Sequence, residues 1–391
     1  MKKKVLLSYS GGLDTSNAIV WLKNNGYDVV SMIADFGEEK DYKLLQSRAI
    51  EIGSSKCHIV DVKDEFVNNY VTPAIHNNAL YEGKYPLISS LSRPLIAKLL
   101  VDIAHEENIN IVAHGCTGKG NDQVRFNVSI RALDPNMEIL MPIRDCPTPR
   151  DEMLKSMKKY NFSLSKYSVD ENLWGRSCEC GELEDPWVQP SKNAYGITNS
   201  PKDSPDTPEI IEIEFNEGTP ISLNNEKIKL SSIITKLNKI AGKHGIGRID
   251  MIENRLVGIK SREIYEAPAA MTIIKAHKIL EDLTILRDMS HFKVIMENEF
   301  ANLVYDGLWF SPLVSAIIAF TKETQKNVSG IVKMELYKGN IIIIGRKSNK
   351  TLYDFNLATY DKEDIFDHSS ADGFTKIWGL PLKTYSKKIL K

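Results

Sequence analysis

Apolar and polar positions follow two alternating rhythms over the first third of the chain. Short runs of aliphatic residues predict buried strands, and between them apolar residues recur every three or four positions, as on one face of a helix. We expect strands at residues 5–7, 29–34, 58–62 and 109–113, and helices at 17–25, 41–52 and 94–107. Strands that alternate with helices indicate βαβ units and a mostly parallel sheet, which binds ligands at the carboxyl ends of its strands.

The rhythm changes after residues 163–208, which are rich in proline, asparagine and serine. This stretch is either a domain boundary or a long ordered excursion. Beyond it the pattern predicts a strand at residues 210–215, helices at 233–240 and 267–291, and a hairpin of 331–336 with 340–345 around Lys338-Gly339. The second half is therefore expected to be a separate α+β domain.

We expect three parts, at residues 1–165, 166–360 and 361–391. The last part contains Phe366, Phe374, Ile377 and Trp378, and is more apolar than a loose tail needs to be. A neighbouring subunit is the partner that we expect it to pack against.

Composition narrows the class of protein. The 391 residues carry 50 basic and 51 acidic side chains, so the basic excess typical of a nucleic-acid-binding protein is missing. No apolar run approaches the roughly 18 residues of a membrane span, and the five scattered cysteines suit a reducing compartment better than a disulfide framework. We expect a cytoplasmic protein without nucleic-acid or membrane partners, and no dedicated metal site.

A glycine-serine loop follows the first expected strand. It reads Ser-Gly-Gly-Leu-Asp-Thr-Ser over residues 10–16, and its glycines, hydroxyls and following helix N-terminus favour a bound phosphate over a simple capped turn. The Lys-Ser/Thr of a Walker loop is missing here, and also after the glycines of residues 115–120. The string resembles the pyrophosphatase loop of N-type ATP pyrophosphatases, which implies cleavage of ATP at its α-phosphate.

A second glycine-rich loop follows the strand expected at residues 109–113. Thr117, Asn121, Asp122 and Arg125 offer donors, an acceptor and a cation within about two helical turns, which suits a ligand with a carboxylate and an ammonium group. A solvated loop that caps the next helix is an equally open reading of its composition.

The two loops together resemble the argininosuccinate synthase family. The resemblance extends over almost the whole chain, through residues 85–94, 168–177, 245–255, 260–266 and 378–381. It implies an N-terminal domain of the adenine nucleotide alpha hydrolase-like fold, a synthetase domain and a C-terminal oligomerisation segment. Two positions depart from the common pattern: Ser8 replaces an alanine, and Glu38 replaces a glutamine.

The resemblance implies that ATP, carrying Mg²⁺ on its phosphates, drives the joining of citrulline and aspartate through a citrullyl-adenylate, in arginine biosynthesis, by a homotetramer. The ATP-binding residues would be Ser8, Tyr9, Ser10, Gly11, Gly12, Leu13, Asp14, Thr15, Ser16, Ala34 and Gly115. Citrulline would contact Tyr85, Ser90, Asn121, Arg125, Ser168, Ser177, Glu253 and Tyr265, and aspartate would contact Thr117, Asn121 and Asp122.

Two residues are candidates for catalytic roles. Asp14 would orient the metal or a water, and Asp122 would act on the aspartate amine as an orienter or a weak base. Two alternatives stay open: another ATP pyrophosphatase that adenylates a different acceptor, and a nucleotide sensor of the same fold without turnover.

Overall fold

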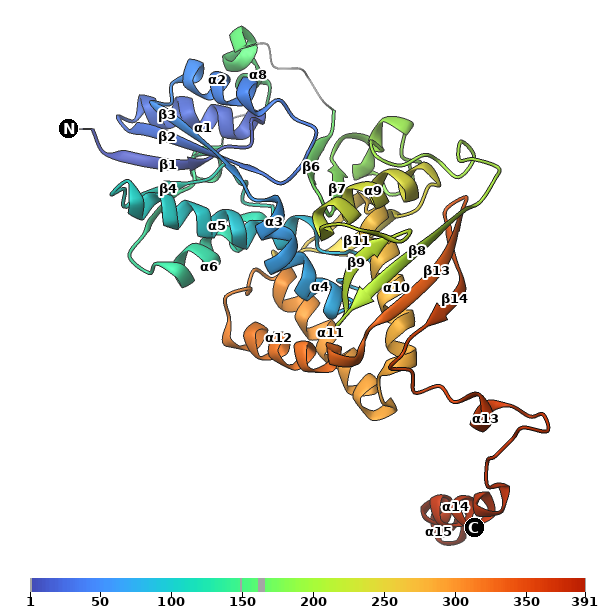
Figure 1. Cartoon of the computed structure of the whole chain (residues 1–391). Coiled ribbons are helices and arrows are strands. Elements are labelled where there is room, and N and C mark those ends of the chain that lie inside the picture. Colours follow the sequence, from blue (N-terminus) through green and yellow to red (C-terminus); the bar gives the residue numbers. More distant parts are fainter. Residues whose placement is uncertain (1, 148–149, 161–165, 391) are drawn as a thin grey trace.

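The computed structural model of the chain describes residues 2–147, 150–160 and 166–390. Its N-terminal part is a five-stranded parallel sheet in the order β3-β2-β1-β4-β5 (Figure 1). The strands are β1 (Lys4–Ser8), β2 (Asp28–Asp35), β3 (Lys56–Asp61), β4 (Ile111–Ala113) and β5 (Glu138–Leu140). The predicted parallel sheet is confirmed. Since the strand order reverses between β1 and β4, the loops after these two strands meet at a topological switch point.

Helices cover both faces of this sheet. Val5 and Leu7 of β1 point into a cluster with Ile19 of α1, whereas Leu6 between them joins the opposite cluster with Leu95 of α5. A strand buried on both faces reads as a continuous apolar run, which is why the sequence signal was clear. The helices here are α1 (Leu13–Asn24), α2 (Tyr42–Ile52), α5 (Ile88–Glu106), α6 (Asp122–Leu133), α7 (Pro142–Asp145) and α8 (Arg150–Met157). The helix expected at 94–107 begins six residues earlier, with Pro94 inside it.

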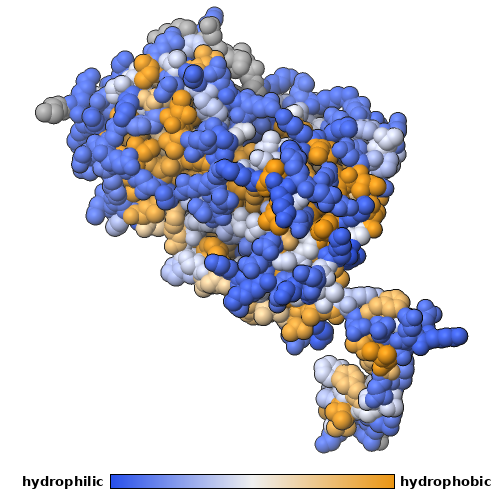
Figure 2. Space-filling model, viewed as in Figure 1, coloured by the Kyte–Doolittle hydropathy of each residue, from blue (hydrophilic) through white to orange (hydrophobic). Residues whose placement is uncertain are grey.

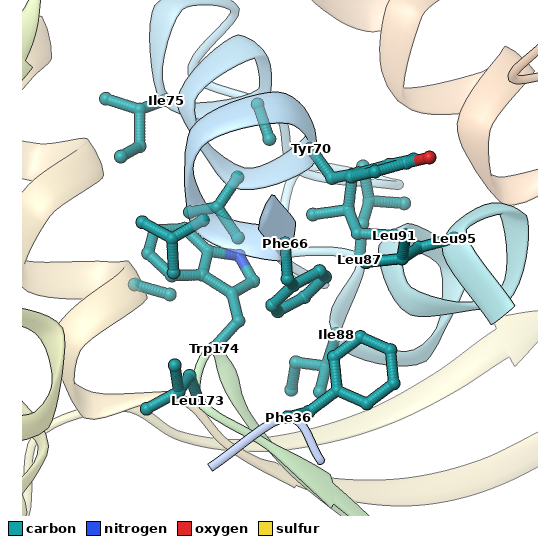
Figure 3. Close-up of a cluster of buried hydrophobic side chains, with 14 of the residues drawn as sticks. Phe36, Phe66, Tyr70, Ile75, Leu87, Ile88, Leu91, Leu95, Leu173 and Trp174 are labelled. Carbon is teal, nitrogen blue, oxygen red and sulfur yellow. The ribbon is translucent and has the colours of Figure 1, made fainter. Parts of the chain in front are cut away.

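One segment of the N-terminal part crosses into the second part. After β3 the chain forms α3 (Lys63–Phe66), a π-helical turn (Val67–Val71) and α4 (Thr72–His76), and α4 packs against helices α10 and α12 of the second part. Figure 3 shows the apolar cluster at this crossing, in which Phe66 meets Phe36 edge to face at a centroid distance of 4.9 Å. The crossing places the two parts on one shared core.

A buried polar network anchors the end of this crossing segment. The Asn78 amide donates to Glu281 and to Glu297, each at 2.7 Å, and Lys293 Nζ lies 3.0 and 2.6 Å from the same two carboxylates. Both carboxylates and the ammonium are buried and paired, as charges in a protein interior must be. The network thereby holds Asn78, at the end of the crossing segment, against the two helices that supply the charged residues.

The second part has two antiparallel sheets, ordered β10-β9-β8-β13-β14 and β11-β12-β7-β6. The strands are β6 (Ser168–Asn172), β7 (Gly175–Glu179), β8 (Glu209–Asn216), β9 (Thr219–Leu223), β10 (Glu226–Lys227), β11 (Arg248–Asn254), β12 (Lys260–Glu266), β13 (Gly330–Tyr337) and β14 (Asn340–Lys347). The helices are α9 (Leu230–Lys243), α10 (Pro268–Thr284), α11 (Arg287–Tyr305) and α12 (Pro312–Thr324). The predicted α+β class and the 338–339 hairpin are confirmed. Because residues 168–179 form a strand pair, the described part of the 163–208 stretch is an ordered excursion.

The prediction of one helix at residues 267–291 is wrong. The chain forms α10 and α11 with a break at Ile285 and Leu286, whose backbones are extended. No glycine or proline marks this break, and the apolar spacing continues through it. Periodicity alone therefore could not locate it.

The C-terminal residues leave the body as an arm (Figure 1), formed by α13 (Phe355–Ala358), α14 (His368–Trp378) and α15 (Leu380–Ile389). Its large apolar side chains are exposed in the single chain, with Ile377 at 76 % and Trp378 at 73 %. Figure 2 shows orange, hydrophobic patches on this arm. Among the described helices none is long and apolar enough to cross a membrane.

Candidate active site

The glycine-serine loop opens at the end of β1. Gly11 has a φ of +79°, and a Cβ there would lie 2.6 Å from a Leu45 methyl carbon, so this position suits glycine. Gly12 is the N-cap of α1 and has no side chain to accept from the first helix amides, which leaves them open to an anion. The hydroxyls of Ser10 and Thr15 lie 3.2 Å apart beside them. The expected phosphate loop therefore has the backbone that such a site needs.

The second glycine-rich loop touches the first one. A Cβ on Gly115 would lie 2.8 Å from the Thr15 methyl and 3.2 Å from its backbone nitrogen. Ala34 belongs to the adjacent strand, two residues past Met32, which pairs with Ser8. The residues predicted to bind ATP are thus neighbours around the switch point.

Glu38, which departs from the family pattern, is bound within its own loop. Its carboxylate accepts from the Phe36 backbone nitrogen at 3.1 Å and from the Tyr42 hydroxyl, and it pairs with Lys40 at 3.0 Å. Its charge is therefore balanced locally.

Asp122 begins α6 and lies between two arginines. Its Oδ2 accepts from Arg93 Nε at 2.9 Å and Nη2 at 2.7 Å, and its Oδ1 accepts from Arg125 Nη1 at 2.8 Å. Although burial opposes ionisation, the two guanidinium groups hold the pKa of this carboxyl far below its usual range. An ionised, fully engaged carboxylate suits an orienting role better than a base.

Glu253 forms the centre of a buried group of tyrosines. Its Oε2 accepts from the Tyr265 hydroxyl at 2.6 Å and its Oε1 from the Tyr305 hydroxyl at 2.7 Å. The Tyr85 ring stacks on Tyr265 at a centroid distance of 4.1 Å. Ser177 of β7 lies opposite Tyr265 in the strand register. Ser168, the first residue of β6, lies opposite Glu179 of β7 and is exposed.

Two buried polar atoms in this region have no hydrogen-bond partner among the described residues: Arg125 Nη2 and Ser90 Oγ. Arg125 Nε donates to the Tyr305 carbonyl at 2.8 Å and Nη1 to Asp122, so the remaining nitrogen is the one left over. Buried polar groups normally have hydrogen-bond partners, and burying one without a hydrogen bond costs free energy. Both atoms belong to residues predicted to bind citrulline, and both are suited to a bound substrate.

The structure thus gathers Tyr85, Asn121, Arg125, Glu253 and Tyr265 around one residue, Tyr305. Asn121 Nδ2 donates to the Tyr305 hydroxyl at 2.7 Å, and Asn121 Oδ1 accepts from the Leu256 backbone nitrogen at 2.9 Å. Thr117, predicted for aspartate, is exposed in the loop that ends at Asn121.

Sequence reasoning missed several members of the site. Arg93 and Asp170 lie within segments that carried the family resemblance, and Arg93 Nη2 donates to Asp170 at 2.6 Å. Their place inside those segments was the available signal, since a pairing across 77 residues is visible only in the structure. Tyr305 lies outside every motif, so no sequence signal pointed to it.

A second missed cluster lies on β11 and β12. Arg255 pairs with Glu179 and, at 3.0 Å, with Glu263. Burial, and then the charges of Glu253 and Glu179, raise the pKa of Glu263 to about 8. Glu263 therefore carries a proton over most of the neutral range.

A doubly wound parallel sheet with a phosphate-type loop at its switch point defines the class of α/β nucleotide-binding proteins. The family model described as the argininosuccinate synthase N-terminal HUP domain matches residues 4–163, and the argininosuccinate synthase C-terminal domain model matches residues 167–385. The chain belongs to the argininosuccinate synthase family, and it is a ligase that forms a carbon–nitrogen bond.

Curated relatives that carry the family's name align with almost the full length of the chain. The chain is 55 % identical over 390 residues to an argininosuccinate synthase of Bacillus licheniformis, covering 98 % of this chain and 97 % of that protein. It is 55 % identical over 388 residues to one of Geobacillus kaustophilus, covering 98 % and 96 %. A solved structure described as a predicted subunit of tRNA methyltransferase from Methanocaldococcus jannaschii is similar over 43 % of this chain and 78 % of that one, at 17 % identity and a TM-score of 0.29, too low to bear on function.

Proposed function

We propose that the chain joins citrulline to aspartate in two chemical steps driven by ATP. The ureido oxygen of citrulline first attacks the α-phosphorus of ATP, and pyrophosphate leaves. The α-amine of aspartate then attacks the activated ureido carbon, loses a proton and expels AMP, which leaves argininosuccinate. Because both nucleophiles belong to substrates, the protein contributes positioning and charge stabilisation.

The observation that carries this proposal is a buried cation and a buried carboxylate that share one tyrosine. Arg125 offers an unpaired guanidinium nitrogen, Glu253 offers a carboxylate, and Tyr305 contacts both. An α-amino acid presents the complementary pair, a carboxylate for Arg125 and an ammonium for Glu253. Ser90, with its unpaired buried hydroxyl, adds a further contact for citrulline.

ATP is proposed to bind along the glycine-serine loop and against Ala34 and Gly115. Aspartate is proposed to lie between the loops, at Thr117, Asn121 and Asp122, where Asp122 orients the amine. The low pKa of Asp122 argues against its taking the amine proton.

We also propose that ATP carries Mg²⁺ on its phosphates. Among the described residues no group of three or more His, Cys, Asp or Glu side chains is placed to hold a metal, and a phosphate-borne Mg²⁺ that keeps its waters needs no such group. Asp14, in the first turn of α1, fits as an acidic partner for that metal or one of its waters. When bound, Mg²⁺ neutralises phosphate charge as pyrophosphate leaves.

The remaining proposals concern organisation. The two family-model ranges support the division of the chain near residue 165, and the exposed apolar arm supports a homotetramer in which residues 361–391 join subunits. Light scattering of the full chain and of a chain ending at residue 360 tests the second point, since the shorter chain should be smaller than a tetramer. The five cysteines, scattered along the sequence in a pattern that suits a reducing compartment, support a cytoplasmic location.

The experiment that tests the function is pyrophosphate release from ATP and Mg²⁺, with citrulline and aspartate each supplied or withheld. We expect release to depend on citrulline, and argininosuccinate to form only when aspartate is also present. Binding of ATP without any release would instead indicate a sensor. Release that ignores citrulline but responds to another acceptor would indicate a different ATP pyrophosphatase.

A further inference from the structure

Tyr305 is a single buried residue that touches the groups proposed for both amino-acid substrates. It is the last residue of α11 and is 1 % exposed. Its hydroxyl accepts from Asn121 Nδ2 and donates to Glu253 Oε1, each at 2.7 Å. Its carbonyl accepts from Arg125 Nε at 2.8 Å.

The ring of Tyr305 is fixed as firmly as its hydroxyl. It stacks on Tyr81 at a centroid distance of 3.5 Å with 4° between the planes, and it meets Tyr85 edge to face at 6.3 Å. The Arg125 guanidinium carbon lies 4.7 Å from the ring centroid, within cation–π range. A ring held by these contacts has little freedom to redirect its hydroxyl.

The direction of the two hydrogen bonds follows from the chemistry. Asn121 Oδ1 accepts from the Leu256 backbone nitrogen, so the Nδ2 end must face Tyr305 and donate to it. The hydroxyl has one proton, which then goes to Glu253. Burial raises the pKa of the Tyr305 hydroxyl, so that it keeps this proton at neutral pH.

We propose that Tyr305 is a positioning residue that couples the citrulline site to the aspartate site through one shared hydroxyl. This inference rests on the proposed function. The hydroxyl orients the Glu253 carboxylate toward the citrulline ammonium. It also orients Asn121, which is proposed to contact both substrates, toward the place where citrulline and aspartate meet. Each carboxylate oxygen has a second lone pair, so Glu253 can hold Tyr305 and an ammonium together.

The test is Y305F, which keeps the ring and its stacking and removes only the hydroxyl. We expect KM to rise about tenfold or more for citrulline and severalfold for aspartate, since a hydrogen bond to a charged group is stronger than one between neutral groups. The KM for ATP should stay within about twofold, because the phosphate loop has no contact with Tyr305. Y70F, which removes a hydroxyl from another buried tyrosine, is the matched control and should leave all three KM values unchanged.

A double-mutant cycle separates positioning from mere stability. If Tyr305 acts through Glu253, the fold-increase in citrulline KM of Y305F/E253Q should be well below the product of the fold-increases of the two single variants. A lower melting temperature with unchanged KM values, equal changes for all three substrates, or a citrulline effect without an aspartate effect would each overturn the inference. Wild-type turnover is measured beside the variants, so its absence would count against the proposed function itself and not against Tyr305 alone.

Discussion

Replacing Glu253 with glutamine is the sharpest single test of the citrulline site. Glu253 is 2 % exposed, and the substitution keeps its shape while removing its charge. An ammonium bound to this carboxylate makes a charge-assisted hydrogen bond, worth about 1.5–3 kcal/mol net. Losing it should raise the citrulline KM about 10- to 150-fold.

The hydrogen bonds around Glu253 make the substitution interpretable. Both carboxylate oxygens accept from phenols, and the Tyr305 proton has no other acceptor because Asn121 donates to its oxygen. The glutamine oxygen should therefore keep facing Tyr305, and only the Tyr265 hydroxyl must turn its proton away from the new amide. We expect the fold to survive, with a melting temperature close to that of the parent.

The assay is citrulline-dependent pyrophosphate release, repeated with 5-ureidopentanoate, which is citrulline without its α-ammonium group. The parent should prefer citrulline strongly, and E253Q should lose most of that preference because the discriminating charge is gone. E217Q, at an exposed glutamate of the β8–β9 turn, is the control. If E253Q discriminates between the two compounds as well as the parent does, the ammonium is bound elsewhere and the assignment fails.

Three further outcomes follow from the structure. K293M should lower the free energy of unfolding in urea by about 3–5 kcal/mol, because it leaves buried carboxylates without their cation. K326M, at an exposed site, is the control and should lower it little; equal losses would show that the network is unimportant. Glu263, with its pKa raised to about 8, keeps a proton that the unfolded chain releases above about pH 4.3, so its contribution to folding stability falls between roughly pH 4 and pH 8. The free energy of unfolding of the parent should therefore fall relative to that of E263Q over this range, and a constant difference between the two would contradict the raised pKa. G11A should raise the KM for ATP severalfold, since its φ is +79° and the added methyl would lie 2.6 Å from a leucine carbon, and an unchanged KM would remove the loop from the ATP site.

The parallel sheet could be predicted because its central strands β1, β2 and β4 are buried on both faces and therefore read as apolar runs. Leu6 packs on one side and Leu7 on the other, so both positions had to be apolar. The break at Ile285 could not be predicted, since packing ends α10 there without a helix-breaking residue. The crossing of residues 63–79 into the second part was hidden for a related reason: an apolar pattern says that a residue is buried, but not against which core.

The site was predictable where its chemistry depends on local sequence. The phosphate loop needs glycine at a positive φ, and Gly11 stood in a recognisable string. Arg125 by itself was indistinguishable from a surface cation, because its meaning comes from Asp122 beside it and from Tyr305, which is 180 residues away. Contacts at such sequence separation leave no pattern in a single chain.

The buried network and the citrulline site are mechanically linked, because the same two elements form both. Helix α11 carries Lys293 in its first half and ends at Tyr305, while the crossing segment carries Asn78 shortly before Tyr81. The network joins α11 to the chain at Asn78. The stacking of Tyr81 on Tyr305, at a centroid distance of 3.5 Å, joins the same two elements a second time, beside the citrulline site. A variant that loosens the network, such as K293M, should therefore raise the KM for citrulline more than the KM for ATP, since the ATP loop is held by the parallel sheet. If K293M raised both KM values together, the two elements would not act as the frame of the amino-acid site.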